Sequence, residues 1–216
     1  DAHNVEFIDK SPDTVLIAVQ GPDTIELIQD RFEIPDKFST NYTESFLYAR
    51  TGYTGEDGVE IMANNEDAES LLTFLIEKGI KPCGLGSRDT LRLEASLPLY
   101  GFELTEDITP VEASLNWTIT NKNEYLGSNR INDQLSGESH KVLKKFTIDS
   151  RKIARTETVG IAGETKGLVT SGNFSPVLNK SIGFILFENM PSHDLIEFDI
   201  RGNLIEGNIV NKRFLS

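Results

Sequence analysis

SFLYARTGYTGEDGVEIMA, residues 45–63, decides the fold of the first half of this 216-residue chain. Its two ends, 45–50 and 59–63, are rich in β-branched and aromatic residues and predict two strands. The residues between them hold three glycines, and the turn dipeptide Asp57-Gly58 is typical of a hairpin loop. Because glycine adopts positive φ angles without a steric penalty, we expect these glycines to shape the loop through such angles.

The same hairpin carries polar groups that a turn does not need. Side chains alternate along a strand, so Val59 and Ile61 should face one side and Glu60 the other. If the Glu60 side borders a cavity, its two carboxylate oxygens suit a planar ligand with two parallel N–H donors, such as the edge of a pterin or a guanine. Tyr53 could stack on that ring. The alternative is that the stretch is a hairpin turn and nothing more.

Strands and helices alternate around this hairpin. The apolar run 14–20 predicts a buried strand, and a helix should follow within 21–32. A second helix should begin at the asparagines 64–65, which can cap it, and end at Gly79; the segment 80–85 then predicts a short strand. The order strand, helix, strand, strand, helix, strand is that of a ferredoxin-like α+β unit.

Cys83, the single cysteine, lies in the predicted strand 80–85, so we expect a buried structural thiol in preference to a reactive one. One cysteine rules out an internal disulfide framework and fits a reducing compartment. His3, His140 and His193 lie far apart in the sequence and lack the spacing of metal ligands. A zinc site is therefore not expected.

Two arginines mark the helix that Ser87 should cap. Arg88 and Arg92 lie four residues apart and share a helix face. Because a helix N-terminus favours anions, Arg88 could hold a carboxylate or phosphate there. The alternative for Arg88 is a surface ion pair with Asp89 or Glu94. For Arg92 we favour a structural role, in which an ion pair holds the helix to a loop.

The charge of the chain is strongly acidic and unevenly divided. A net charge of −13 argues against general nucleic-acid binding, which needs a basic surface. Residues 1–140 hold 10 Lys/Arg against 26 Asp/Glu, a net of −16, whereas residues 141–216 hold 11 against 8, a net of +3. The basic part could face an anionic partner, although a mixed solvated surface explains it as well. We expect neither a membrane span nor a signal peptide.

The second half of the chain has a different pattern. Residues 119–140 are rich in Asn, Ser and Gly and predict a linker, which could contain a short helix. After them, short strand-like runs alternate with turn residues, which suggests a small antiparallel barrel or sandwich. We therefore expect two domains, residues 1–130 with an α+β fold and residues 131–216 with an all-β fold.

Five segments, taken in order, resemble one protein family. They are IAVQGP (17–22), RTGYTGEDGVEI (50–61), GLGSRDTLRLEASLPLYGFEL (84–104), TPVEASLNWTI (109–119) and GLVTSGNFSPVLNKSIGF (167–184). Together they resemble the glycine cleavage system T-protein, the tetrahydrofolate-dependent aminomethyltransferase. The resemblance implies a three-domain cloverleaf around a folate channel. The first domain here would be its ferredoxin-like part, and the second domain would be its C-terminal barrel.

The resemblance also implies site residues. On the family pattern, Glu60 binds the pterin edge of tetrahydrofolate, Tyr53 lines the folate site and Arg88 contacts the folate. Family members are longer, and their catalytic aspartate lies in the region before Asp1. No residue of this chain is therefore given the catalytic role, and we expect the chain alone to be inactive or weak.

The activity implied is a transfer of one carbon in glycine catabolism. Family members accept an aminomethyl group from the lipoyl arm of the H-protein and pass its one-carbon unit to tetrahydrofolate, with release of ammonia. The implied partners are the lipoylated H-protein and the missing N-terminal part, with no nucleic acid and no membrane. The implied location is the cytoplasm, or the mitochondrial matrix in a eukaryote. The alternative is a folate-binding module or a demethylase-like relative without this activity. The net-positive second part could attract a folate polyglutamate tail or an acidic H-protein surface.

Overall fold

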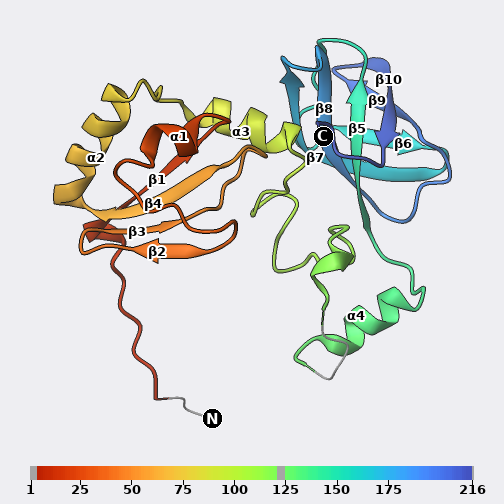
Figure 1. The fold of residues 1–216 in the computed structure, drawn as a ribbon. Helices are drawn as coiled ribbons and strands as arrows, with labels where there is room; N and C mark the ends of the chain where they lie inside the picture. Colours follow the sequence, from red (N-terminus) through yellow and green to blue (C-terminus); the bar gives the residue numbers. More distant parts are fainter. Residues whose placement is uncertain (1–3, 121–124, 216) are drawn as a thin grey trace. The chain divides into compact units, whose positions relative to one another are not determined.

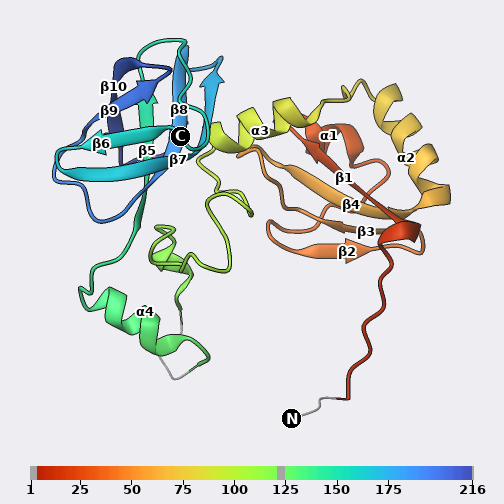
Figure 2. The same cartoon turned by 180° about the vertical axis from the view of Figure 1, so that it is seen from behind.

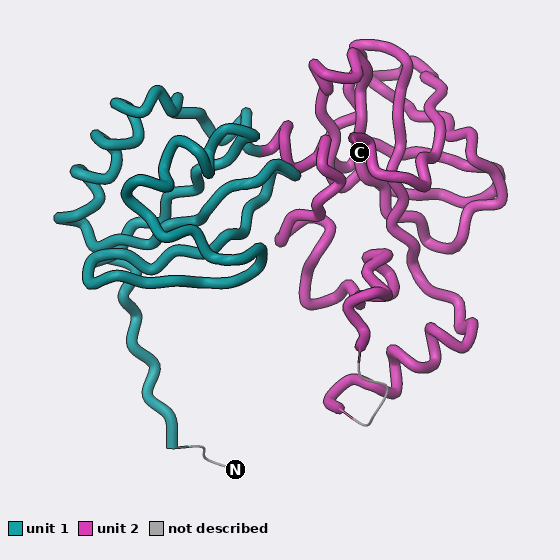
Figure 3. Tube along the Cα trace, viewed as in Figure 1, with its two compact units in different colours: residues 1–88 teal, residues 89–216 magenta. Residues whose placement is uncertain are grey.

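The structure is a computed structural model that describes residues 4–120 and 125–215. The chain divides into two compact units, residues 1–88 and residues 89–216 (Figure 3). No helix in the described ranges is long and apolar enough to cross a membrane. Each unit contains some of the residues that the sequence singles out.

The first unit is built on a four-stranded antiparallel sheet (Figure 1). Its strands, in spatial order, are β1 (Thr14–Gln20), β4 (Gly58–Asn64), β3 (Phe46–Ala49) and β2 (Thr40–Tyr42). A single 3-10 turn, Ser11–Asp13, leads into β1. The predicted strands β1, β3 and β4 are confirmed, and β4 lies in the middle of the sheet between β1 and β3. The short strand β2 was not predicted.

Two helices cover one face of this sheet. They are α1 (Thr24–Ile28) and α2 (Asn65–Glu77), and their apolar side chains join those of β1, β3 and β4 in one core. The predicted cap of α2 is confirmed, because the Asn64 side chain accepts a hydrogen bond from the Asp67 backbone N–H at 2.7 Å. The first helix is shorter than the 21–32 segment, although single hydrogen-bonded turns continue to Phe32. The core residues of this unit with less than 3 % exposure are Val19, Ile28, Phe32, Tyr48, Val59, Ile61, Ala63 and Leu71.

The prediction of a strand over 80–85 is wrong. These residues form no strand, and helix α3 begins at Leu85 and runs to Glu94. Pro82 lacks the backbone N–H that a central sheet position requires, which explains why the segment pairs with nothing. Cys83 is exposed, so the expectation of a buried thiol is also wrong. The first five elements of the ferredoxin-like order are therefore present, with the extra strand β2 inserted before β3 and without the final strand. Ser87 lies inside α3, so it is not the cap.

The second unit is dominated by a closed six-stranded barrel, seen from both sides in Figures 1 and 2. Its spatial order is β10-β5-β8-β7-β6-β9, with antiparallel neighbours throughout. The predicted barrel is confirmed, and the sandwich alternative is excluded. The strands are β5 (Val142–Ile148), β6 (Val159–Ala162), β7 (Thr165–Ser175), β8 (Lys180–Phe187), β9 (Leu195–Ile200) and β10 (Asn203–Val210).

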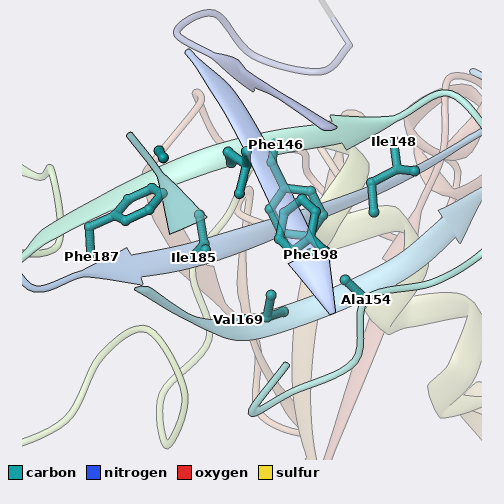
Figure 4. Close-up of a cluster of buried hydrophobic side chains, with 9 residues drawn as sticks. Phe146, Ile148, Ala154, Val169, Ile185, Phe187 and Phe198 are labelled. Carbon is teal, nitrogen blue, oxygen red and sulfur yellow. The ribbon is translucent and has the colours of Figure 1, made fainter. Parts of the chain in front are cut away.

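Large apolar side chains fill the barrel (Figure 4). The rings of Phe146 and Phe198 lie 4.6 Å apart between centroids, and both are fully buried. Glycines make room for them: a Cβ on Gly183 would lie 2.5 Å from the Phe146 ring. The apolar strand runs of the sequence therefore become the core of a small closed barrel.

A polar loop region links α3 to the barrel. It contains the 3-10 turn Asn116–Thr118 and helix α4 (Ser128–Leu135), which lies inside the predicted linker 119–140. Part of that linker, residues 121–124, lies outside the described residues. The predicted linker is thus partly helical.

Arg92 has the structural role that the sequence favoured. Its side chain is buried and forms ion pairs with Asp89 at 2.8 Å and Glu103 at 3.1 Å. It also donates to the Ser171 hydroxyl of β7 at 2.8 Å, and Ser171 in turn donates to Glu103 at 2.6 Å. Because every charge in this cluster has a partner, Arg92 ties the end of α3 to the following loop and to the barrel.

Candidate functional site

Glu60 lies on the open face of the first unit's sheet. Its neighbours Val59 and Ile61 are fully buried under the helices, so the alternation expected along β4 is confirmed. Glu60 itself is half-buried on the opposite face. Its cross-strand partners are Ala18 on β1 and Ala49 on β3. Because both partners are small, no long side chain flanks the carboxylate on either neighbouring strand.

The hairpin loop orients this carboxylate. The hydroxyl of Thr51 donates a hydrogen bond to Glu60 Oε2 at 2.7 Å. The donor is neutral, so the bond fixes the direction of the carboxylate while leaving its negative charge uncompensated. The arrangement suits a ligand that brings its own N–H donors.

Gln20 fastens the loop from the end of β1. Its side-chain Nε2 donates to the backbone oxygens of Thr51 at 3.1 Å and Val59 at 3.2 Å, and its Oε1 accepts from the Thr54 hydroxyl at 3.5 Å. One side chain therefore ties both ends of the loop to the neighbouring strand. Gln20 is visible in the sequence as the polar residue that closes an apolar strand, but its role depends on contacts that only the fold brings together.

The glycines of the loop act differently from the prediction. Only Gly55 has a positive φ, of 83°. A Cβ on Gly52 would lie 1.7 Å from the Gln20 side-chain oxygen, and a Cβ on Gly58 would lie 2.3 Å from the Val19 backbone oxygen. Two of the three glycines are thus needed because β1 approaches closely, which the sequence does not reveal.

An ion pair joins the two ends of the loop. Arg50 Nε lies 3.1 Å from Asp57 Oδ1, and Arg50 Nη2 lies 2.7 Å from Asp57 Oδ2. The guanidinium lowers the pKa of the Asp57 carboxyl to about 2, helped by a hydrogen bond from the Gly58 backbone N–H. Sequence reasoning treated Asp57 only as a turn residue. The signal that it missed is an arginine and an aspartate at the two ends of one loop.

The other two predicted site residues, Tyr53 and Arg88, are in contact with each other. The Arg88 guanidinium carbon lies 5.1 Å from the centroid of the Tyr53 ring, which is a cation–π arrangement. The alternative ion pairs for Arg88 do not form, because Asp89 pairs with Arg92 and Glu94 accepts a hydrogen bond from Ser175. The loop that carries Tyr53 is the one that Thr51 joins to Glu60.

These three groups belong to one unit. A carboxylate provides acceptors, an aromatic ring provides a flat apolar face, and a guanidinium provides a positive charge. A ligand with N–H donors, a flat ring and a carboxylate could use all three.

Comparison with known proteins places the two halves of the chain in one family. Residues 1–123 match the family model of the GCVT N-terminal domain, and residues 141–215 match that of the glycine cleavage T-protein C-terminal barrel domain. The two models leave residues 124–140 unmatched, so the domain boundary at residue 130 stays a prediction.

Individual relatives agree with these models. An aminomethyltransferase of Picosynechococcus sp. is 36% identical over 227 residues, which cover 99% of this chain and 62% of the relative. One of Thermosipho melanesiensis is 37% identical over 225 residues, with the same coverage of 99% and 62%. The crystal structure of glycine cleavage system aminomethyltransferase T from Bartonella henselae has a TM-score of 0.84 and 27% identity, over 94% of this chain and 60% of that chain.

The chain therefore spans about three-fifths of the length of the relatives that it matches. The match nevertheless runs through both units, from the sheet that carries Glu60 to the closed barrel. On the two family models, the relatives and the shared fold together, this chain belongs to the glycine cleavage T-protein family of aminomethyltransferases.

Proposed function

We propose that this chain provides the tetrahydrofolate-binding residues of an aminomethyltransferase of the glycine cleavage system. The observation that supports this most directly is the contact of Arg88 with Tyr53, because Tyr53 belongs to the same loop that orients Glu60. The sequence singled out these three side chains separately, and one unit of the fold contains all three.

Each side chain has a distinct part in the proposed binding. Glu60 accepts hydrogen bonds from the N–H groups at the edge of the pterin, and Thr51 holds the carboxylate in place for this. Tyr53 lies against the folate, and Arg88 contacts an anionic group of the same ligand. Arg88 lies over the Tyr53 ring, and this contact supports a shared role of the two side chains in the proposed binding.

The proposed reaction is the transfer of a one-carbon unit to tetrahydrofolate. The donor is the aminomethyl group on the lipoyl arm of the H-protein. The products are methylenetetrahydrofolate, ammonia and the reduced lipoyl arm. The proposed setting is a reducing compartment, either the cytoplasm or the mitochondrial matrix.

The chemical step needs more than the binding residues described above. We propose that the catalytic aspartate of the family lies in the part of its length that this chain does not span. The chain alone should then form little or no methylenetetrahydrofolate from glycine with the other cleavage components. Addition of the N-terminal part of the relatives should restore turnover. Full turnover by residues 1–216 alone would contradict the proposal.

The binding step is tested by removing the Glu60 carboxylate. Calorimetry with tetrahydrofolate should show that Glu60→Ala weakens binding tenfold or more, because a charge-assisted bidentate contact contributes about 1.5–3 kcal/mol. Glu56→Ala is a matched control, since Glu56 is an exposed carboxylate of the same loop. Equal affinities for wild type and Glu60→Ala would remove Glu60 from the site.

The same measurements separate the alternative function. A folate-binding module or a demethylase-like relative would bind tetrahydrofolate with the same dependence on Glu60. It would form no methylenetetrahydrofolate from the aminomethylated H-protein, even after the N-terminal part is supplied.

A further inference from the structure

A basic cavity lies on the barrel, among residues that the proposed folate site does not use. Its volume is about 430 Å³. The segment that joins β5 to β6 supplies one wall, and the β9–β10 hairpin supplies the other. The lining residues are Arg151, Lys152, Ile153, Arg155, Thr158, Asp199, Ile200, Arg201 and Asn203.

The cavity concentrates positive charge. Four of its lining residues are cationic and one, Asp199, is anionic. Asp199 uses Oδ1 to accept a hydrogen bond from the Gly202 backbone N–H at 2.8 Å, which closes its own hairpin turn. In the described parts of the chain, none of the four cations has a carboxylate within ion-pair distance. Their charges are therefore not neutralised by the protein.

The fold holds two of these cations in defined places. Arg201 and Gly202 form the tip of the β9–β10 hairpin with positive φ angles of 56° and 78°. Such angles are uncommon for a residue other than glycine, so the tight turn fixes the direction in which Arg201 leaves the backbone. The Arg151 guanidinium lies 4.6 Å from the centroid of the Phe174 ring, which supports it from the barrel side.

We propose that this cavity binds a small anion that carries two or more carboxylate or phosphate groups. Guanidinium groups bind both kinds of oxyanion with paired N–H donors. The volume suits a small molecule. Several charges are required of the ligand because these cations are exposed, and a single exposed ion pair contributes little. This site shares no residue with the proposed folate contacts of Glu60, Tyr53 and Arg88, so either proposal can fail without the other.

The experiment uses the whole chain and two probes, tetraglutamate and inorganic tripolyphosphate. Monomeric glutamate and orthophosphate serve as the corresponding small anions. Calorimetry should show that at least one probe binds tenfold or more tightly than its monomer, with an affinity that falls as salt is added. Amide NMR shifts should change at Thr158 and Gly202. The probe with the higher affinity identifies carboxylate or phosphate as the preferred group.

Variants locate the binding. The double variant Arg155→Gln/Arg201→Asn should lose at least tenfold in affinity for the preferred probe, and asparagine tolerates the positive φ at position 201. Lys166→Gln is the control, because Lys166 is an exposed cation of the same barrel that does not line this cavity. A circular dichroism melt confirms that both variants fold. Equal losses in the double variant and the control, or no preference for a probe over its monomer, would overturn the proposal.

Discussion

Asp57 and Glu60 lie three residues apart, and the fold uses their carboxylates in different ways. Asp57 is held by the Arg50 guanidinium through two close contacts, so its charge stabilises the loop. Glu60 accepts a hydrogen bond from the neutral hydroxyl of Thr51, and we propose that its charge serves a ligand. Strand alternation in the sequence predicted the face of the sheet on which Glu60 lies. The role of Asp57 depends on the distance across the closed loop, which alternation cannot give.

The Arg50–Asp57 pair should make stability depend on pH. The folded pKa of Asp57, about 2, lies below the ordinary value of 3.8 for an aspartate carboxyl without partners. The stabilisation is therefore fully present above about pH 4 and is lost as the pH falls toward about 2. Because both side chains are partly exposed to solvent, we expect Asp57→Asn to lower the free energy of unfolding by only about 1 kcal/mol at pH 7.

Urea denaturation at several pH values measures this difference. The gap between wild type and Asp57→Asn should shrink as the pH falls below about 4, because wild-type Asp57 becomes protonated in the unfolded state first. A gap that stays constant across this range would show that Asp57 stabilises the loop without its charge.

At the scale of the element, the hairpin between β3 and β4 is held from a neighbouring strand. Gln20, at the end of β1, bonds to the backbone of both loop ends. The pattern of glycines and turn residues was enough to predict the hairpin. It was not enough to predict why Gly52 and Gly58 are glycines, because the atoms that exclude a Cβ belong to β1.

Gly52→Ala tests this packing. The new Cβ would displace the Gln20 side chain and break its hydrogen bonds to the loop, so we expect a loss of about 1–2 kcal/mol in stability and weaker tetrahydrofolate binding. In a Gln20→Ala background the same change should cost much less, because the obstructing side chain is gone. Urea denaturation of the wild type, Gly52→Ala, Gln20→Ala and the double variant measures the coupling free energy between the two changes.

Gly86→Ala is the control for this experiment. Its Cβ would meet nothing within 4 Å inside α3, so the change should be neutral or slightly stabilising. Purely additive effects of the Gly52 and Gln20 changes would contradict the packing explanation.

At the scale of the whole molecule, the two units have separate cores. The sheet and its helices enclose one apolar cluster, and the barrel encloses another around Phe146 and Phe198 (Figure 4). Local pattern predicted most of the strands of both units, but not the short strands β2 and β6. It also predicted a strand over 80–85, wrongly, because the apolar residues there suggested burial while Pro82 prevents pairing.

Separate cores predict separate responses to mutation. Phe146→Ala should destabilise the barrel by about 3–5 kcal/mol, because it leaves a cavity in a fully buried site. Tetrahydrofolate binding through Glu60 should persist under conditions in which the first unit remains folded. Amide hydrogen exchange, measured separately for the residues of each unit, shows which unit the variant destabilises. Leu204→Ala is the control, because Leu204 is 73% exposed. Equal loss of protection in both units would show that they unfold together.

The sequence by itself determined the hairpin, the alternation around Glu60, the cap of α2, the barrel strands other than β6, and the structural role of Arg92. These depend on local pattern or on residue chemistry, which a sequence carries directly. Only the tertiary structure decided the contact of Arg88 with Tyr53, the ion pair of Arg50 with Asp57 and the exposure of Cys83. The same is true of the four cations gathered at the barrel cavity. Each of these features depends on which segments of the chain meet in space. That is set by the packing of the four-stranded sheet with its helices and by the closure of the barrel.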